Sequence, residues 1–118
     1  MRLRRHDHTG LVRLRGFDTL RFGLNRPAPD ALRGGDAAYN AAAVHTMLSG
    51  APGAARDAVL ANAAGALAAH RGAVEGASSF EDAFADGLER ARVAVDSGAA
   101  STLLERWVKL SATLAEPS

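Results

Sequence analysis

Four histidines are the side chains of this sequence that could support acid–base or metal chemistry. Histidine changes its charge near neutral pH and is a common metal ligand. His6 and His8 flank Asp7 in a segment without regular period, where we expect at most adventitious metal binding. His45 and His70 fall on separate predicted helices without a second histidine one turn away, so we interpret both as surface or helix-end residues.

The sequence Gly34-Gly35-Asp36 is the second candidate for chemistry, because a glycine-rich turn before a helix can hold phosphate with its N–H groups. The alternative is a tight turn that leads into an aspartate N-cap, and we favour it because Asp36 would repel phosphate. We interpret Asn62 as a satisfied buried amide and Trp107 as a core anchor. The sequence therefore nominates no catalytic, cofactor-binding or metal-binding residue.

Length and composition limit the class of protein. A chain of 118 residues fits one domain, and because alanine supplies about half of its 47% apolar residues and aromatics only 5%, we expect a thin core. The sequence has no cysteine, which excludes disulfides and thiolate sites. No apolar run approaches the ~20 residues of a membrane span. We therefore expect a cytoplasmic protein without a membrane partner.

Charge is distributed unevenly along the chain. Residues 1–35 carry eight arginines and three aspartates, whereas residues 36–118 carry six basic and ten acidic residues. A basic end can indicate a nucleic-acid-binding arm. This one has no interleaved aromatic residues and no recognisable binding motif, so we interpret it as a solvated tail and expect no nucleic-acid partner.

The N-terminal part of the chain is predicted to be weakly structured. Residues 1–10 show neither helical nor strand period, and one or two short strands are predicted within 11–24. Pro27 and Pro29 then indicate an extended linker. We predict a basic leader with short strands over residues 1–27 and a helical part over residues 28–118.

Four helices are predicted in the remainder, with a loop over residues 72–78. Their N-terminal and C-terminal signals are Asp36, Ser79, Gly50 and Gly98. The second helix consists almost entirely of small apolar residues, and we expect it to be deeply buried. Small alanines also favour close helix packing. The predicted helices span about 36–49, 52–70, 79–96 and 99–114.

Three stretches of the sequence stand out as a set: residues 31–41 (ALRGGDAAYNA), 53–67 (GAARDAVLANAAGAL) and 94–100 (AVDSGAA). In this order and spacing they resemble the closing segment of anthranilate phosphoribosyltransferases. The family belongs to a glycosyltransferase group that also includes pyrimidine nucleoside phosphorylases. The resemblance covers about residues 28–112, and we find no counterpart for residues 1–10. It implies that the chain is the mostly α-helical C-terminal part of an α/β phosphoribosyltransferase domain.

The resemblance also implies a reaction, the transfer of phosphoribose from phosphoribosyl pyrophosphate to anthranilate in tryptophan biosynthesis, with magnesium on the pyrophosphate. The family's phosphate loop, phosphate-binding basic residue, anthranilate-binding groups and Asp-Glu metal pair would all lie upstream. We therefore carry no functional residue over and expect no cofactor on this segment. Such a fragment, from a truncated, frameshifted or separately started gene, would be inactive alone and expose an apolar face.

The expected partner is the upstream part of the same enzyme or a separately encoded half. Three alternatives stay open: a non-catalytic helical interaction module, a homodimer and an origin in a pyrimidine nucleoside phosphorylase. Co-purification of an upstream partner would favour a split enzyme, whereas a cooperatively melting monomer would favour the module.

Overall fold

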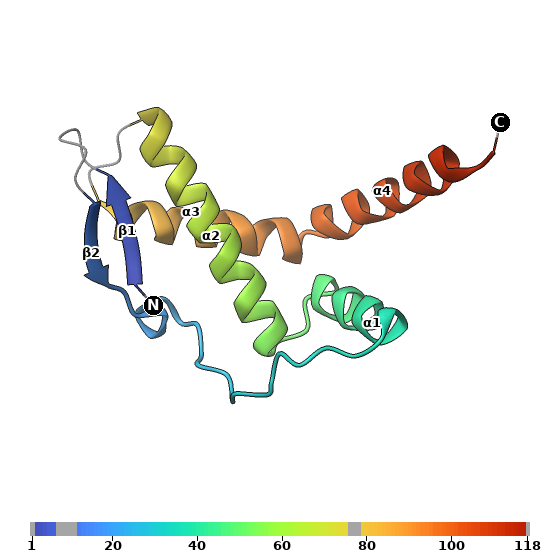
Figure 1. Ribbon diagram of the computed structural model, residues 1–118, viewed down its shortest axis with the longest axis horizontal. Coiled ribbons are helices and arrows are strands. Elements are labelled where there is room, and N and C mark those ends of the chain that lie inside the picture. Colours follow the sequence, from blue (N-terminus) through green and yellow to red (C-terminus); the bar gives the residue numbers. More distant parts are fainter. Residues whose placement is uncertain (1, 7–11, 76–78, 118) are drawn as a thin grey trace.

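The computed structural model describes residues 2–6, 12–75 and 79–117. These residues form two strands, one 3-10 helix and four α-helices in the order β1, β2, η1, α1, α2, α3, α4. Figure 1 shows α2 and α3 crossing at the centre of the molecule, with the strands at one end and α1 and α4 at the other. The prediction of a mostly helical segment with about four helices after one or two short strands is confirmed.

Strands β1 (Arg2–His6) and β2 (Val12–Gly16) pair as an antiparallel hairpin, with Arg4 opposite Leu14. The strand predicted to begin near residue 11 is confirmed as β2. The prediction that residues 1–10 lack regular structure is wrong for β1. A strand is stabilised by backbone hydrogen bonds to its neighbour, so this arginine-rich segment forms one without an alternating side-chain pattern.

Residues 17–24, which we predicted as a second strand candidate, contain instead the 3-10 helix η1 (Thr19–Phe22). The Asp18 carboxylate accepts a hydrogen bond from the backbone N–H of Leu20 at 3.1 Å. Gly23, with a φ of 78°, ends the turn in the left-handed region. An aspartate that caps its own local turn competes with strand pairing, and this explains the difference.

Three of the α-helices begin and end close to the predicted boundaries. The Asp36 side chain caps α1 (Ala37–Leu48), and the Ser79 hydroxyl caps α3 (Phe80–Asp96). Helix α4 (Ala99–Ala115) follows a glycine in the left-handed conformation. The starts of α1 and α3 are local because the Asp36 and Ser79 side chains each satisfy an N–H donor that the first helical turn leaves open.

Helix α2 (Ala54–Glu75) is longer than predicted. We expected it to end near residue 70 and to give way to a loop at Gly72, but the helix continues through that glycine. One glycine inside a helix costs roughly 1 kcal/mol relative to alanine. The packing of α2 against α3 offsets a cost of this size, so the glycine does not end the helix.

The core of the described part is built around an aromatic cluster. Phe84 is completely buried, and its ring centroid lies 4.8 Å from those of both Phe17 and Phe22. Phe80 contacts Phe17 edge-on at 5.2 Å. Because Phe17 precedes η1 and Phe22 is its last residue, the N-terminal segment is packed onto α3. The other core residues are Leu24, Leu60, Ala64, Ala68, Ala83, Leu88, Ala91 and Val95.

Helices α2 and α3 pack closely through small residues. A Cβ atom added at Gly87 would lie 3.0 Å from the Ala64 carbonyl oxygen and 3.1 Å from the Leu67 Cβ, so the crossing requires glycine. This agrees with the expected close packing. Burial of α2 is confined to one face, however: Ala68 is buried whereas Val59 is 42% exposed, and the prediction of deep burial for the whole helix is wrong.

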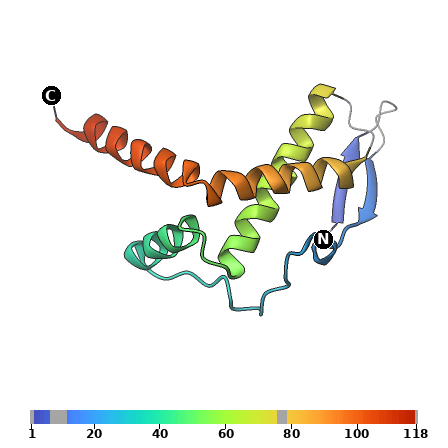
Figure 2. The same ribbon diagram turned by 180° about the vertical axis from the view of Figure 1, so that it is seen from behind.

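Helix α4 leaves the body of the molecule. Figure 2 shows it from behind, extending past α1 to the C-terminal end of the chain. Leu104 is its last partly covered residue, and Trp107 is 67% exposed. The prediction that Trp107 anchors a core is therefore wrong, because no described element lies over that face. None of the helices in the described ranges is long and apolar enough to cross a membrane.

Candidate functional site

Arg56 and Asp96 form a close polar contact between two helices. The two guanidinium nitrogens Nη1 and Nη2 donate to the two carboxylate oxygens at 2.8 and 3.0 Å. Arg56 lies in the first turn of α2 and Asp96 is the last residue of α3, so the pair joins the ends of the two crossing helices. The Arg56 side chain is 14% exposed and that of Asp96 is 53% exposed.

The pair also corrects two unfavourable charge placements. A cation in the first turn of α2 and an anion in the last turn of α3 each lie at the helix end whose dipole opposes that charge. A bidentate contact neutralises both and fixes their orientation. The hydrogen bond from Arg56 lowers the pKa of Asp96 below its ordinary value of 3.8, and the hydrogen bond to Asp96 raises the pKa of Arg56.

Two further hydrogen bonds attach the segment before α1 to these helices. The Arg92 guanidinium donates to the Phe22 carbonyl oxygen at 3.2 Å. The backbone N–H of Asn25 donates to the Asp57 carboxylate at 3.3 Å. Together with the aromatic cluster, these contacts hold residues 17–25 against α2 and α3. The N-terminal segment is thus part of the framework that positions the helices.

The turn at Gly34 and Gly35 is the element that we weighed as a phosphate loop. The Asn40 side chain accepts from the Gly35 N–H at 2.9 Å and donates to the Gly35 carbonyl at 3.1 Å. The Asp36 carboxylate accepts from the Tyr39 N–H at 2.8 Å. Two N–H groups that a phosphate would need are therefore already bonded. The alternative of a tight turn with an aspartate N-cap is confirmed.

Both glycines of this turn lie close against side chains of α1. A Cβ atom at Gly34 would lie 2.9 Å from the Asn40 side-chain oxygen, and one at Gly35 would lie 3.0 Å from the Tyr39 ring. The glycines let the Asn40 amide close over the turn. This contact gives residues 31–41, the first stretch that carries the family resemblance, a structural role.

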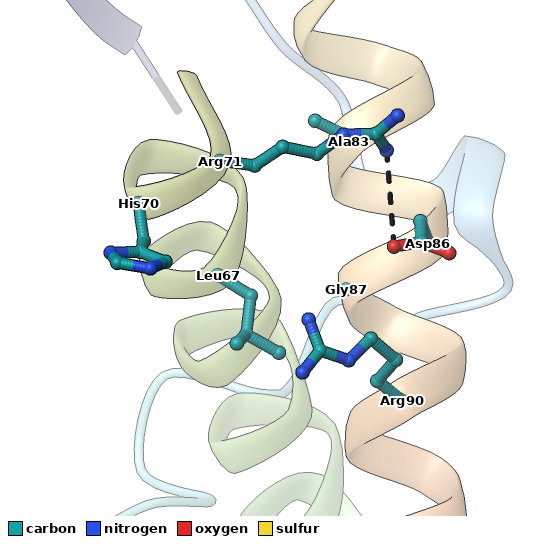
Figure 3. Close-up of a pocket in the computed structure, with 7 residues that line it drawn as sticks. All are labelled: Leu67, His70, Arg71, Ala83, Asp86, Gly87 and Arg90. Carbon is teal, nitrogen blue, oxygen red and sulfur yellow. Dashed lines mark ion pairs between the residues drawn. The ribbon is translucent and has the colours of Figure 1, made fainter. Parts of the chain in front are cut away.

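A cleft of about 360 Å³ lies between α2 and α3. Figure 3 shows Arg71 reaching across it toward Asp86, with Arg90 directed at α2 from the other helix. The Arg71–Asp86 ion pair is long at 3.8 Å, and both side chains are about half exposed. The cleft is therefore a partly charged surface groove. Its lining residues are Leu67, His70, Arg71, Ala83, Asp86, Gly87 and Arg90.

The structure separates the histidines that we considered first. His45 is exposed in the last turn of α1, and His70 is exposed on α2 at the edge of the cleft. The backbone of His6 belongs to β1, while His8 lies outside the described residues. Within the described ranges, no group of three or more histidine, aspartate or glutamate residues is arranged to hold a metal ion.

Asn62 differs from its prediction in one respect. Its amide donates to the Ala58 carbonyl at 2.8 Å, so it is satisfied as predicted, but the side chain is exposed instead of buried. It lies on the uncovered face of α2. A polar residue within an apolar sequence was the correct signal for a hydrogen bond and an unreliable one for burial.

Sequence reasoning did not assign a role to Arg56, Asp96 or Asn40. All three stand within the stretches that carry the family resemblance, which was the only available signal. Their contacts hold helices and turns in place. Among the described residues, this arrangement positions structural elements and offers a charged surface groove.

Comparison with known proteins agrees with the resemblance. The family model "Glycosyl transferase family, a/b domain" matches residues 3–101. The chain is 49% identical over 106 residues to an anthranilate phosphoribosyltransferase of Rhodococcus jostii, covering 90% of this chain and 29% of that protein. The same-named protein of Nocardia farcinica is 46% identical over 110 residues, covering 91% of this chain and 32% of the relative.

A third relative, the anthranilate phosphoribosyltransferase of Mycobacterium leprae, is 50% identical over 95 residues, with 80% of this chain and 26% of that protein covered. The chain thus spans about a third of the length of these relatives or less, and corresponds to their C-terminal region. The match begins at residue 3, so the prediction that residues 1–10 lack a counterpart is wrong. The chain belongs to the glycosyl transferase family, a/b domain.

Proposed function

We propose that this chain is the C-terminal part of an anthranilate phosphoribosyltransferase, the enzyme that transfers phosphoribose from phosphoribosyl pyrophosphate to anthranilate in tryptophan biosynthesis. The observation that carries the proposal is the 49% identity over 106 residues to the Rhodococcus jostii protein of that name. The three stretches that carry the family resemblance also support it, because they contain the Gly34–Asn40 turn and the Arg56–Asp96 pair.

The contribution of the segment is structural. Phosphoribosyl transfer depends on positioning two substrates and on neutralising the charge of the pyrophosphate, for which the family uses magnesium. The groups that bind substrates and magnesium would belong to the remaining part of the enzyme. This segment would supply helices that support them, with α2 and α3 locked together by the aromatic cluster and the Arg56–Asp96 pair.

The partner is the remaining part of the enzyme, whether in the same polypeptide or separately encoded. The exposed apolar side chains of α1 and α4 support this requirement, because large apolar areas left open to water favour association. We also keep as a proposal the division into residues 1–27, a basic leading segment, and residues 28–118, the helical part.

The test compares the chain alone with a complete enzyme that contains it. Loss of anthranilate fluorescence is followed with phosphoribosyl pyrophosphate and magnesium. The second sample is a chimera in which the matched C-terminal region of the Rhodococcus jostii protein is replaced by this chain. We expect turnover by the chimera and none by the chain alone.

Either of two results would overturn the proposal. Turnover by the isolated chain would mean that it carries catalytic groups of its own. A chimera that folds, as judged by circular dichroism and cooperative melting, yet has no activity would mean that this segment does not serve the reaction.

A further inference from the structure

Helix α4 carries an apolar stripe that no described element covers, with Val108, 58% exposed, at its edge. Leu103, Trp107, Leu110 and Leu114 are 62%, 67%, 57% and 76% exposed. We call these four residues the α4 seam. They lie at positions i, i+4, i+7 and i+11, so they share one side of the helix over three turns. Every residue from 105 to 117 is exposed, so the seam extends well beyond the body of the molecule.

The spacing of the seam indicates the shape of its partner. Alternating steps of four and three residues give the narrow stripe by which one helix packs along another. Leu104, which faces the body and is partly covered, stands outside this repeat. The seam is therefore suited to a second, roughly aligned helix and is distinct from the contact that already holds the start of α4.

Charge beside the seam separates the candidate partners. Arg106 borders the seam on one flank, and further round on the same side Lys109 stands one turn after Glu105. The opposite flank carries the uncharged Leu104, Val108 and Ser111. A second copy of α4 would offer no carboxylate to Arg106 in either orientation, and an antiparallel copy would place like charges together. The flank instead fits a helix with acidic side chains.

The length of the relatives indicates where the partner helix comes from. The relatives extend far beyond the 29% to 32% of their length that this chain matches. We propose that the α4 seam binds an amphipathic helix with an acidic flank from the remaining part of the enzyme, and this rests on the proposed function. The seam is then an assembly surface that fixes the end of this segment onto the rest of the protein.

The test measures the accessibility of single thiols, which the chain itself lacks. Leu110→Cys places a thiol in the seam, and Ala112→Cys places the control thiol on the far side of the same helix. Each is introduced into the isolated chain and into the chimera, and its alkylation rate is read by peptide mass spectrometry. We expect the seam thiol to react at least about tenfold more slowly in the chimera, with the control unchanged.

A second pair of variants tests the charge of the partner. In the chimera with Leu110→Cys, Arg106→Glu is expected to increase the alkylation rate several-fold because it opposes an acidic flank. Arg106→Lys keeps the charge and should leave the rate unchanged. Equal alkylation rates for the two variants would contradict an acidic flank on the partner helix.

The remaining outcomes are distinguishable. An active chimera whose seam thiol reacts as fast as in the isolated chain would contradict binding of a partner helix at the α4 seam. The proposed function would be left intact. Protection of the seam thiol in the isolated chain that grows with protein concentration would assign the seam to a second copy and overturn our choice of partner. A folded but inactive chimera would count against the proposed function, and against the seam with it.

Discussion

Helices α3 and α4 have the same length, 17 residues each, and both carry apolar side chains at helical spacing. Helix α3 buries six residues, including Phe84 and Leu88, in contacts with α2 and the N-terminal segment. Helix α4, all of which the structure describes, buries none. The comparison teaches that an amphipathic sequence determines that a helix forms, whereas burial depends on whether a partner is present.

The largest expected effect is at the centre of the packed region. Phe84→Ala should lower the free energy of unfolding by about 3–5 kcal/mol, because it removes a buried ring and leaves a cavity among the other phenylalanines. Urea unfolding followed by circular dichroism measures the loss. Phe84→Leu is the control and should cost clearly less; equal costs would contradict close packing of the ring.

A second substitution tests the helix crossing. Gly87→Ala should destabilise the chain by about 1–3 kcal/mol, since its Cβ would press on the Ala64 carbonyl of α2. Gly65 is the matched control because a Cβ there meets no atom of the described residues within 4 Å. Gly65→Ala should stabilise the helix by up to ~1 kcal/mol. Thermal melts that shift in the same direction for both variants would refute the close crossing.

The stability that the Arg56–Asp96 ion pair contributes should depend on pH. The pKa of Asp96 is lowered in the folded chain, so its ion pair stabilises the fold above the ordinary value of 3.8 and the effect is lost as the pH falls below it. Wild type should therefore exceed Asp96→Asn in stability at neutral pH, and the difference should shrink in acid. Asp86→Asn, which removes the longer and more exposed ion pair, is expected to change the stability little at neutral pH.

The smallest effect on stability is expected in α4, and it tests the difference between α3 and α4 most directly. Trp107→Ala should change the stability of the isolated chain by less than ~0.5 kcal/mol, because the indole is largely in water. In the chimera the same substitution should lower the melting temperature if a partner covers the α4 seam. A large loss in the isolated chain, measured by the same urea titration, would mean that Trp107 has a partner there.

Local chemistry accounts for what sequence reasoning predicted well. The starts of α1 and α3 follow from Asp36 and Ser79, whose side chains cap nearby N–H groups. The buried face of α3 follows from its spacing. The turn at Gly34 was also predictable, since the capping role of Asp36 and its charge both disfavour a bound phosphate.

Several of the errors and omissions share one cause, which is dependence on distant neighbours. Strand β1 exists through its pairing with β2, and Trp107 is exposed because nothing described lies over α4. Arg56 and Asp96 are 40 residues apart, so no local pattern indicates that they meet. The same holds for Arg92 and the Phe22 carbonyl, 70 residues apart.

The sequence by itself determined the existence of the four α-helices, the caps of α1 and α3, the charge distribution and the family, because these depend on neighbouring residues or on direct similarity to known sequences. Only the tertiary structure decided which apolar faces are covered, that Gly87 permits the crossing of α2 and α3, and that Arg56 pairs with Asp96. The physical reason is that burial and ion pairing are properties of two surfaces brought together, and a linear pattern describes only one of them.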